Sequence, residues 1–205
     1  MASHLDGVTA LFGDMDAAYQ DHAQAYGFSC DGCRDNCCQT RFHHHTVMEF
    51  IYLRQGLQTL PPDRQRQISA SCRRIFDIYR AQADTGDQVR VWCPLNAQGR
   101  CLLYHYRPMI CRLHGIPHEL HSPAGGVQYH PGCETFSQLA GLKVSYRTFD
   151  RTPFYRRMAA LEQGLRRELD FTQRLKMTVA QMLTADDLFN TLCSRLAAKQ
   201  FGNKP

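Results

Sequence analysis

The 205-residue sequence has no apolar run near the ~20 residues that a membrane-spanning helix needs. Its first residues lack the basic segment and following apolar segment of a secretory signal. No GxGxxG loop opens a helix after a strand, so the usual dinucleotide-binding motif is missing. Repeats and low-complexity linkers are missing too, which argues against disordered and fibrous classes. We therefore expect a cytoplasmic globular protein with no membrane partner.

The sequence also lacks a large excess of charge of either sign. Lys and Arg together number 24 and Asp and Glu 19, which gives a formal net charge of +5. Ligation of a metal requires deprotonated thiols, and eight such thiolates around two divalent ions would bring the chain close to neutral. The arginines of the C-terminal third alternate with acidic residues, and no aromatic stacking pattern accompanies them. Nucleic acid is therefore not an expected partner.

Cysteine is the abundant exception, with ten residues. Cys72 and Cys193 recur at helical spacing with apolar neighbours, which predicts small buried hydrophobic side chains. The other eight lie in turn-rich stretches that contain Asp-Gly, Pro and Gly-Gly signals. These eight are the candidate metal ligands: Cys30, Cys33, Cys37, Cys38, Cys93, Cys101, Cys111 and Cys133.

The spacing of these cysteines favours metal over disulfides. A disulfide between the adjacent Cys37 and Cys38 would close almost no loop, and disulfides need an oxidising compartment. Cys30 and Cys33 have the two-residue spacing of a metal knuckle, whereas a zinc ribbon needs two such pairs. In an extended backbone adjacent side chains point to opposite faces, so we expect Cys37 and Cys38 to serve two centres or two ions of one cluster. Eight sulfurs fit two four-sulfur sites, or one cluster and one mononuclear site.

The fold class expected is mainly α: one helical domain over 1–205 around an irregular cysteine-rich metal-binding centre with short β-hairpins. The metal-binding core is expected at 28–135, with helical flanks at 1–27 and 136–205. Thr46-Val-Met-Glu49 predicts a capping box, in which Thr caps the third helical amide and Glu returns to the cap amide. A turn at 96–99 should bring Cys101 back toward Cys93. The expected helices are 7–24, 47–59, 63–83, 153–170, 172–184 and 186–199.

The second cysteine segment, residues 93–112, resembles a known sequence motif. Cys93-Pro-Leu, Gly99-Arg-Cys101-Leu-Leu-Tyr104 and Arg107-Pro108-Met-Ile-Cys111-Arg112 resemble the YkgJ-type cysteine-cluster family, whose pattern is CxxCxxCC followed by CPfL…GxCxIY…RPxxCR. The first cluster departs from that pattern, since three residues separate Cys33 from Cys37 where the family has two. The resemblance covers roughly 28–135. It implies a zinc- or iron-chelating domain, commonly described as iron–sulfur-containing, with no assigned biochemical role.

Several polar residues near the cysteines are secondary candidates. Arg107 and Arg112 are expected either to stabilise thiolates around a cofactor or to tie a loop to backbone carbonyls. His114 and His130 each lie three residues from a cysteine and are candidate ligands. The run 43–45 consists of three histidines and is expected to be an ordinary turn before a helix rather than an accessory metal site.

These features lead to one expected function and two alternatives. The first is a metal-binding protein with a cysteine-ligated iron centre, of the iron–sulfur kind, in a redox, sensing or metal-dependent role. The second is a structural or chelating zinc protein with two four-cysteine sites that acts through a protein partner. The third is a metalloenzyme with an open coordination position. Catalytic residues and substrate are not identified by the sequence.

Overall fold

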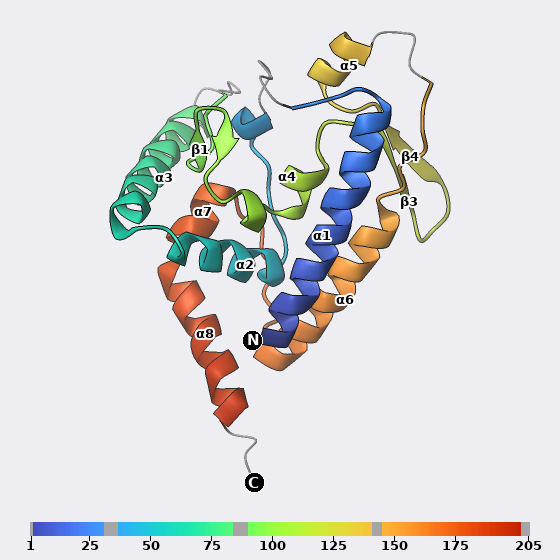
Figure 1. Cartoon of the computed structure of the whole chain (residues 1–205). Helices are drawn as coiled ribbons and strands as arrows, with labels where there is room; N and C mark the ends of the chain where they lie inside the picture. Colours follow the sequence, from blue (N-terminus) through green and yellow to red (C-terminus); the bar gives the residue numbers. More distant parts are fainter. Residues whose placement is uncertain (1, 31–36, 84–89, 141–144, 202–205) are drawn as a thin grey trace.

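The computed structural model describes residues 2–30, 37–83, 90–140 and 145–201 (Figure 1). The helices are α1 (Ala2–Ala25), α2 (Val47–Gln58), α3 (Pro62–Ala83), α4 (Met109–Leu113), α5 (Glu134–Ala140), α6 (Thr152–Leu169), α7 (Val179–Thr184) and α8 (Asp186–Phe201). Two 3-10 turns, η1 (Cys37–Gln39) and η2 (Tyr104–Tyr106), accompany the strands β1 (Asn96–Ala97), β2 (Arg100–Cys101), β3 (His118–His121) and β4 (Val127–His130). The expected mainly helical architecture with short hairpins is confirmed.

Helices α1 and α6 lie side by side along much of their length (Figure 1). The apolar face predicted within 7–24 points into the core, where Val8, Leu11 and Met15 have no exposed surface. Gly7 permits the close approach of the two helices, because a Cβ at that position would lie 2.9 Å from Leu161 of α6. Burial of such side chains contributes on the order of 1.5–3 kcal/mol each and holds this helix pair together.

Helix α2 crosses near the α1–α6 pair and is buried along most of its length (Figure 1). Thr46 caps it as predicted, since its hydroxyl accepts a hydrogen bond from the Glu49 amide at 3.1 Å. The first two amides of α2, at Val47 and Met48, donate to the Glu162 carboxylate of α6 at 2.8 and 2.9 Å. A negative charge at a helix N-terminus is favoured by the helix dipole, so Glu162 fixes α2 on α6.

The hairpin β1–β2 is the turn expected at 96–99. Asn96 pairs with Cys101 and Ala97 with Arg100, which leaves a two-residue loop of Gln98 and Gly99. Both loop residues have positive φ, 53° and 83°, as in the type I′ turns that suit two-residue hairpins. The chain reversal brings Cys101 back beside the segment that carries Cys93.

The C-terminal third departs from the sequence-based expectation at one place. The helix expected over 172–184 is wrong for its first half, because α7 begins only at Val179. Residue Met177 instead exchanges two backbone hydrogen bonds with His44, at 2.7 and 3.0 Å, and this bridge holds the preceding segment out of a helix. Thr178 then starts α7 with a capping box to Gln181. In the described parts of the chain, no helix is both long and apolar enough to cross a membrane.

Candidate functional site

Five cysteines from three segments of the chain lie close enough to influence one another's pKa values. We call them the inner thiol group: Cys37, Cys38, Cys93, Cys101 and Cys111. A backbone hydrogen bond of 2.7 Å from the Cys93 amide to the Cys38 carbonyl joins the first two segments. The thiols are also within electrostatic reach, since Cys38, Cys101 and Cys111 each act on the pKa of Cys93.

Burial makes most of these thiols difficult to ionise. The pKa of Cys101 is raised to about 11, first by burial and then by the nearby Cys38, and that of Cys111 is raised to about 12, first by burial and then by Cys101 and Cys38. The pKa of Cys93 is raised well above its ordinary value, again first by burial. Three neutral thiols therefore face one another at neutral pH. Such a set becomes a strong soft-ligand group once a bound cation takes the place of the protons.

The adjacent pair Cys37 and Cys38 lies differently from the sequence-based expectation. The expectation assumed an extended backbone with thiols on opposite faces, and this is wrong because both residues lie in the 3-10 turn η1. Their side chains hydrogen-bond to each other, which lowers the pKa of Cys38 to about 6 and raises that of Cys37. Arg107 and the Asn96 side chain stabilise the Cys38 thiolate further. The pair therefore presents its sulfurs on one side, toward the same place.

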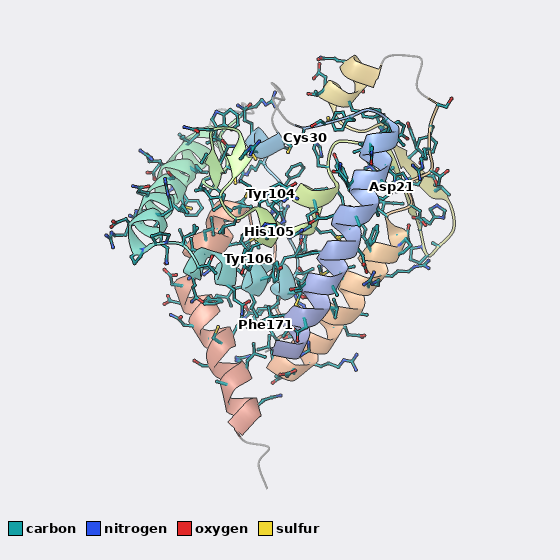
Figure 2. The ribbon with its side chains drawn as sticks, viewed as in Figure 1. Asp21, Cys30, Tyr104, His105, Tyr106 and Phe171 are labelled. Carbon is teal, nitrogen blue, oxygen red and sulfur yellow. The ribbon has the colours of Figure 1, made fainter. Side chains whose placement is uncertain are left out.

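Two more cysteines lie around a tyrosine of α1, and we call Cys30 and Cys133 the outer thiol pair. The Tyr19 hydroxyl lies 3.7 Å from the Cys30 sulfur and donates to the His114 carbonyl at 2.9 Å. Burial, Cys30 and Cys133 together raise the pKa of Tyr19, so its phenol stays protonated. Cys30 is exposed, and Figure 2 shows it at the upper end of the molecule. Cys33 lies outside the described residues.

The two arginines beside the inner thiol group are anchored by one carboxylate. Arg112 is 4 % exposed and donates to the Asp16 carboxylate of α1 at 2.5 Å. It also donates to the backbone carbonyls of Arg107 and His105. Arg107 lies 3.6 Å from the same Asp16 carboxylate and donates to the Cys111 carbonyl at 3.3 Å. Both arginines thus tie loops to carbonyls, and Arg107 also lowers the pKa of Cys101 and Cys111.

Glu49 connects α2 to the cysteine segment in a way that the capping-box expectation missed. Its carboxylate accepts from the Thr46 hydroxyl at 2.6 Å and from the Met109 amide of α4 at 2.8 Å. The residue is 6 % exposed, and burial raises its pKa. The glutamate side chain was expected to return to the Thr46 amide. It reaches across to the start of α4 instead, which fixes the short helix that carries Cys111.

The histidine candidates lie at the edges of this arrangement. His114 ends α4, and its ring lies edge-on to Phe42 with centroids 5.2 Å apart. The His130 ring stacks on His118 across β3 and β4 at 4.6 Å. The histidines at 43–45 line a separate cavity. Their expected role as an ordinary turn is incomplete, because His44 is buried and pairs with Met177.

The two cysteines set apart by the sequence lie in helices. Cys72 of α3 has no exposed surface, and burial raises its pKa to about 12. Cys193 of α8 packs against the core while remaining partly exposed. Both behave as small apolar side chains. They therefore provide matched controls for the cysteines of the site.

The chemistry of the donor set suits a metal with soft ligands, since the nine described cysteines are all free thiols. Within residues 2–30, 37–83, 90–140 and 145–201, however, no three His, Cys, Asp or Glu side chains are arranged to hold a metal ion. Comparison with models of protein families, with curated proteins and with solved structures found no match. Any function must therefore be argued from the chain's own residues.

Proposed function

We propose that this protein binds a cysteine-ligated iron centre, of the iron–sulfur kind, and serves in a redox, sensing or metal-dependent role. The observation that carries the proposal is the inner thiol group. Five free thiols from three chain segments lie within electrostatic reach of one another in a partly buried place. A cation that binds their deprotonated form would replace the protons of several of these thiols at once.

Eight sulfurs would fill two four-sulfur zinc sites as well, and it is their division into five and three that favours iron over zinc. A structural zinc ion takes four ligands in a tetrahedron, whereas the inner thiol group has five sulfurs and the outer thiol pair and Cys33 add three. A centre with several metal ions can use the fifth sulfur of the inner thiol group, and the adjacent thiols of Cys37 and Cys38 suit neighbouring irons of one cluster. The similarity of 93–112 to the YkgJ-type motif agrees with this assignment.

The surroundings supply what such a centre requires. Arg107 lies close enough to Cys38, Cys101 and Cys111 to lower the pKa of each. Arg112 of α4 is buried and held by Asp16, and its positive charge also lowers the pKa of Cys101. Positive charge and hydrogen bonds around thiolates set the reduction potential of a cluster. The centre, when bound, would supply electron transfer or Lewis acidity; the arginines hold its ligands and offset its charge.

The test is elemental analysis with acid-labile sulfide on protein purified without oxygen, together with a visible spectrum. The single tryptophan, Trp92, precedes Cys93 and adds an internal reporter. An iron centre that absorbs light near it should quench its emission, whereas colourless Zn²⁺ should not. We expect iron, sulfide and a quenched Trp92. Two zinc ions without sulfide would refute the iron assignment and favour the structural zinc alternative.

Matched cysteine variants separate the site from the fold. Cys101→Ser and Cys111→Ser should each lose bound metal and restore Trp92 emission. Cys72→Ala and Cys193→Ser should keep both metal and spectrum, because these residues lie on helices away from the inner thiol group. Metal loss in Cys72→Ala at unchanged helicity, or full metal content in both site variants, would contradict the proposal.

A further inference from the structure

A second candidate site adjoins the first turn of α4, and none of the cysteines lines it. It is a cavity of about 790 Å³ between the start of α2, the first turn of α4 and one face of α6. Apolar walls come from Met109 and Ile110 of α4, Met158 of α6 and Phe171. In Figure 2, Phe171 lies well below Cys30. The volume is within the range of roughly 300–1,000 Å³ that is usual for sites of small organic ligands.

One buried polar atom in the wall of this cavity has no partner. His44 is 4 % exposed and is one of the residues that line the cavity, and its buried Nε2 atom has no hydrogen-bond partner among the described residues. The backbone of His44 is fixed on both sides by the bridge to Met177. An unsatisfied buried polar atom is unfavourable, and native structures rarely retain one without a reason. The missing partner is the first indication of a ligand.

The charges of the cavity cancel, which limits the kind of ligand. Glu162 is neutralised by Arg166 at 2.5 Å and accepts from two backbone amides as well. At the rim, Arg167 and Asp170 are both exposed and of opposite sign. Burial lowers the pKa of His44 to about 4, so its ring is neutral at pH 7.

Glu49 is the one remaining carboxylate among the described residues that line the cavity, and it does not call for a cationic ligand. Both of its oxygens already accept hydrogen bonds, from the Thr46 hydroxyl and the Met109 amide. Burial also raises its pKa, which favours the neutral acid. Lys176 and Arg41 lie near His43 outside the cavity lining, and both are exposed to water, which screens their charges. An uncharged ligand is therefore favoured.

We propose that this cavity binds a small uncharged organic molecule with an apolar ring or chain and one hydroxyl group, which pairs with His44. A hydroxyl both donates and accepts, so it satisfies Nε2 in either tautomer of the neutral imidazole. The apolar body fills the space between the methionines and Phe171. The site contains none of the cysteines, and it does not depend on the metal centre.

The test uses three probes with the same ring system: 2-naphthol, 2-methylnaphthalene and 2-naphthoate. Titrations by calorimetry or probe fluorescence should show 2-naphthol binding about tenfold more tightly than 2-methylnaphthalene, the usual effect of one satisfied hydrogen bond. The carboxylate should bind most weakly. Failure of all three probes to bind, or preference for 2-naphthoate, would overturn the proposal. Titrations before and after removal of metal should agree, which separates this result from the iron proposal.

Two helix α6 variants locate the binding. Ala159 is exposed and lines the cavity, whereas its exposed neighbour Ala160 does not. Ala159→Trp should abolish binding of 2-naphthol, and Ala160→Trp should leave it unchanged. Gln163→Trp, at a second exposed lining position, serves if Ala159→Trp does not fold. His44→Phe should remove the preference for 2-naphthol over 2-methylnaphthalene. Unchanged binding in a folded tryptophan variant at 159 or 163 would refute the location.

Discussion

The contact between Gly56 and Tyr106 predicts that one substitution has opposite effects at two helical glycines. Gly56 lies in α2, and a Cβ added there would meet the Tyr106 ring at 2.4 Å and the Tyr106 Cβ at 2.7 Å. Gly13 lies in α1, is exposed, and its added Cβ would meet no atom within 4 Å. Replacing glycine by alanine inside a helix ordinarily stabilises it by about 0.5–1 kcal/mol.

At Gly13 this gain should appear in full. At Gly56 it is opposed by overpacking, which costs about 1–3 kcal/mol when a side chain is forced into a filled space. Gly56→Ala is therefore expected to lower the free energy of unfolding by about 1–2 kcal/mol. Tyr106 belongs to η2, which leads to Arg107 and Cys111, so the same variant should also weaken metal retention. Gly13→Ala should leave metal retention unchanged.

Urea unfolding followed by circular dichroism measures both effects, with equal m-values as the check that the unfolded states match. In a Tyr106→Ala background, Gly56→Ala should cost less than in the original chain, because the two ring carbons that the new methyl group would meet are no longer there. Equal stabilisation by Gly13→Ala and Gly56→Ala would refute the reasoning. That result would mean that Gly56 of α2 and Tyr106 of η2 are not packed as closely as the structure shows.

Three other perturbations have definite expected outcomes. The pKa of His44 is about 4 in the folded protein, below the value of 6.5 in the unfolded chain, so its contribution to stability is complete above pH 6.5 and is lost as the pH falls toward 4, by about 3 kcal/mol in total. His44→Phe should flatten this part of a stability–pH profile measured by urea unfolding. An unchanged slope would contradict the prediction. Arg151 is 1 % exposed, and its Nε and Nη2 atoms have no hydrogen-bond partner among the described residues. Arg151→Met should therefore raise the free energy of unfolding of the metal-free protein by about 1 kcal/mol. A clear fall in Tm would show that the guanidinium has a stabilising partner. Asp16→Asn removes the carboxylate that pairs with Arg112. Because Asp16 is 39 % exposed, the free energy of unfolding should fall by about 1–2 kcal/mol. Asp14→Asn, which removes the exposed pair with Arg157, is the control.

The sequence predicts those parts of the fold that depend on neighbouring residues. The helix after Thr46 begins where the capping signal places it, and Asn96 to Gly99 form the expected reversal. Each of these signals is complete within about four residues. The mistakes arise where distant residues decide. Residues 172–177 have no local reason to avoid a helix, and the partner that holds them, His44, is far away in the sequence.

The candidate site shows the same division. Spacing and composition select the cysteines, but the 3-10 turn at Cys37 and Cys38 and the backbone hydrogen bond that joins Cys38 to Cys93 are seen only in the structure. Asp16, Tyr19 and Glu162 carry no signal in their own segments. Their importance follows from partners 96, 95 and 115 residues away along the chain. A single sequence contains no record of such contacts, so only the folded arrangement identifies them.

The link from Asp16 to Arg112 also bears on how the protein is made. During synthesis the chain emerges from its N-terminus, and Asp16 leaves the ribosome 96 residues before Arg112. The segments that carry Cys38, Cys93 and Cys111 likewise appear one after another, and each is too short to be stable alone. Helix α6, which fixes the start of α2 through Glu162, follows later still. The Asp16–Arg112 pair, the inner thiol group and the contact of Glu162 with α2 can therefore form only after most of the chain has been made.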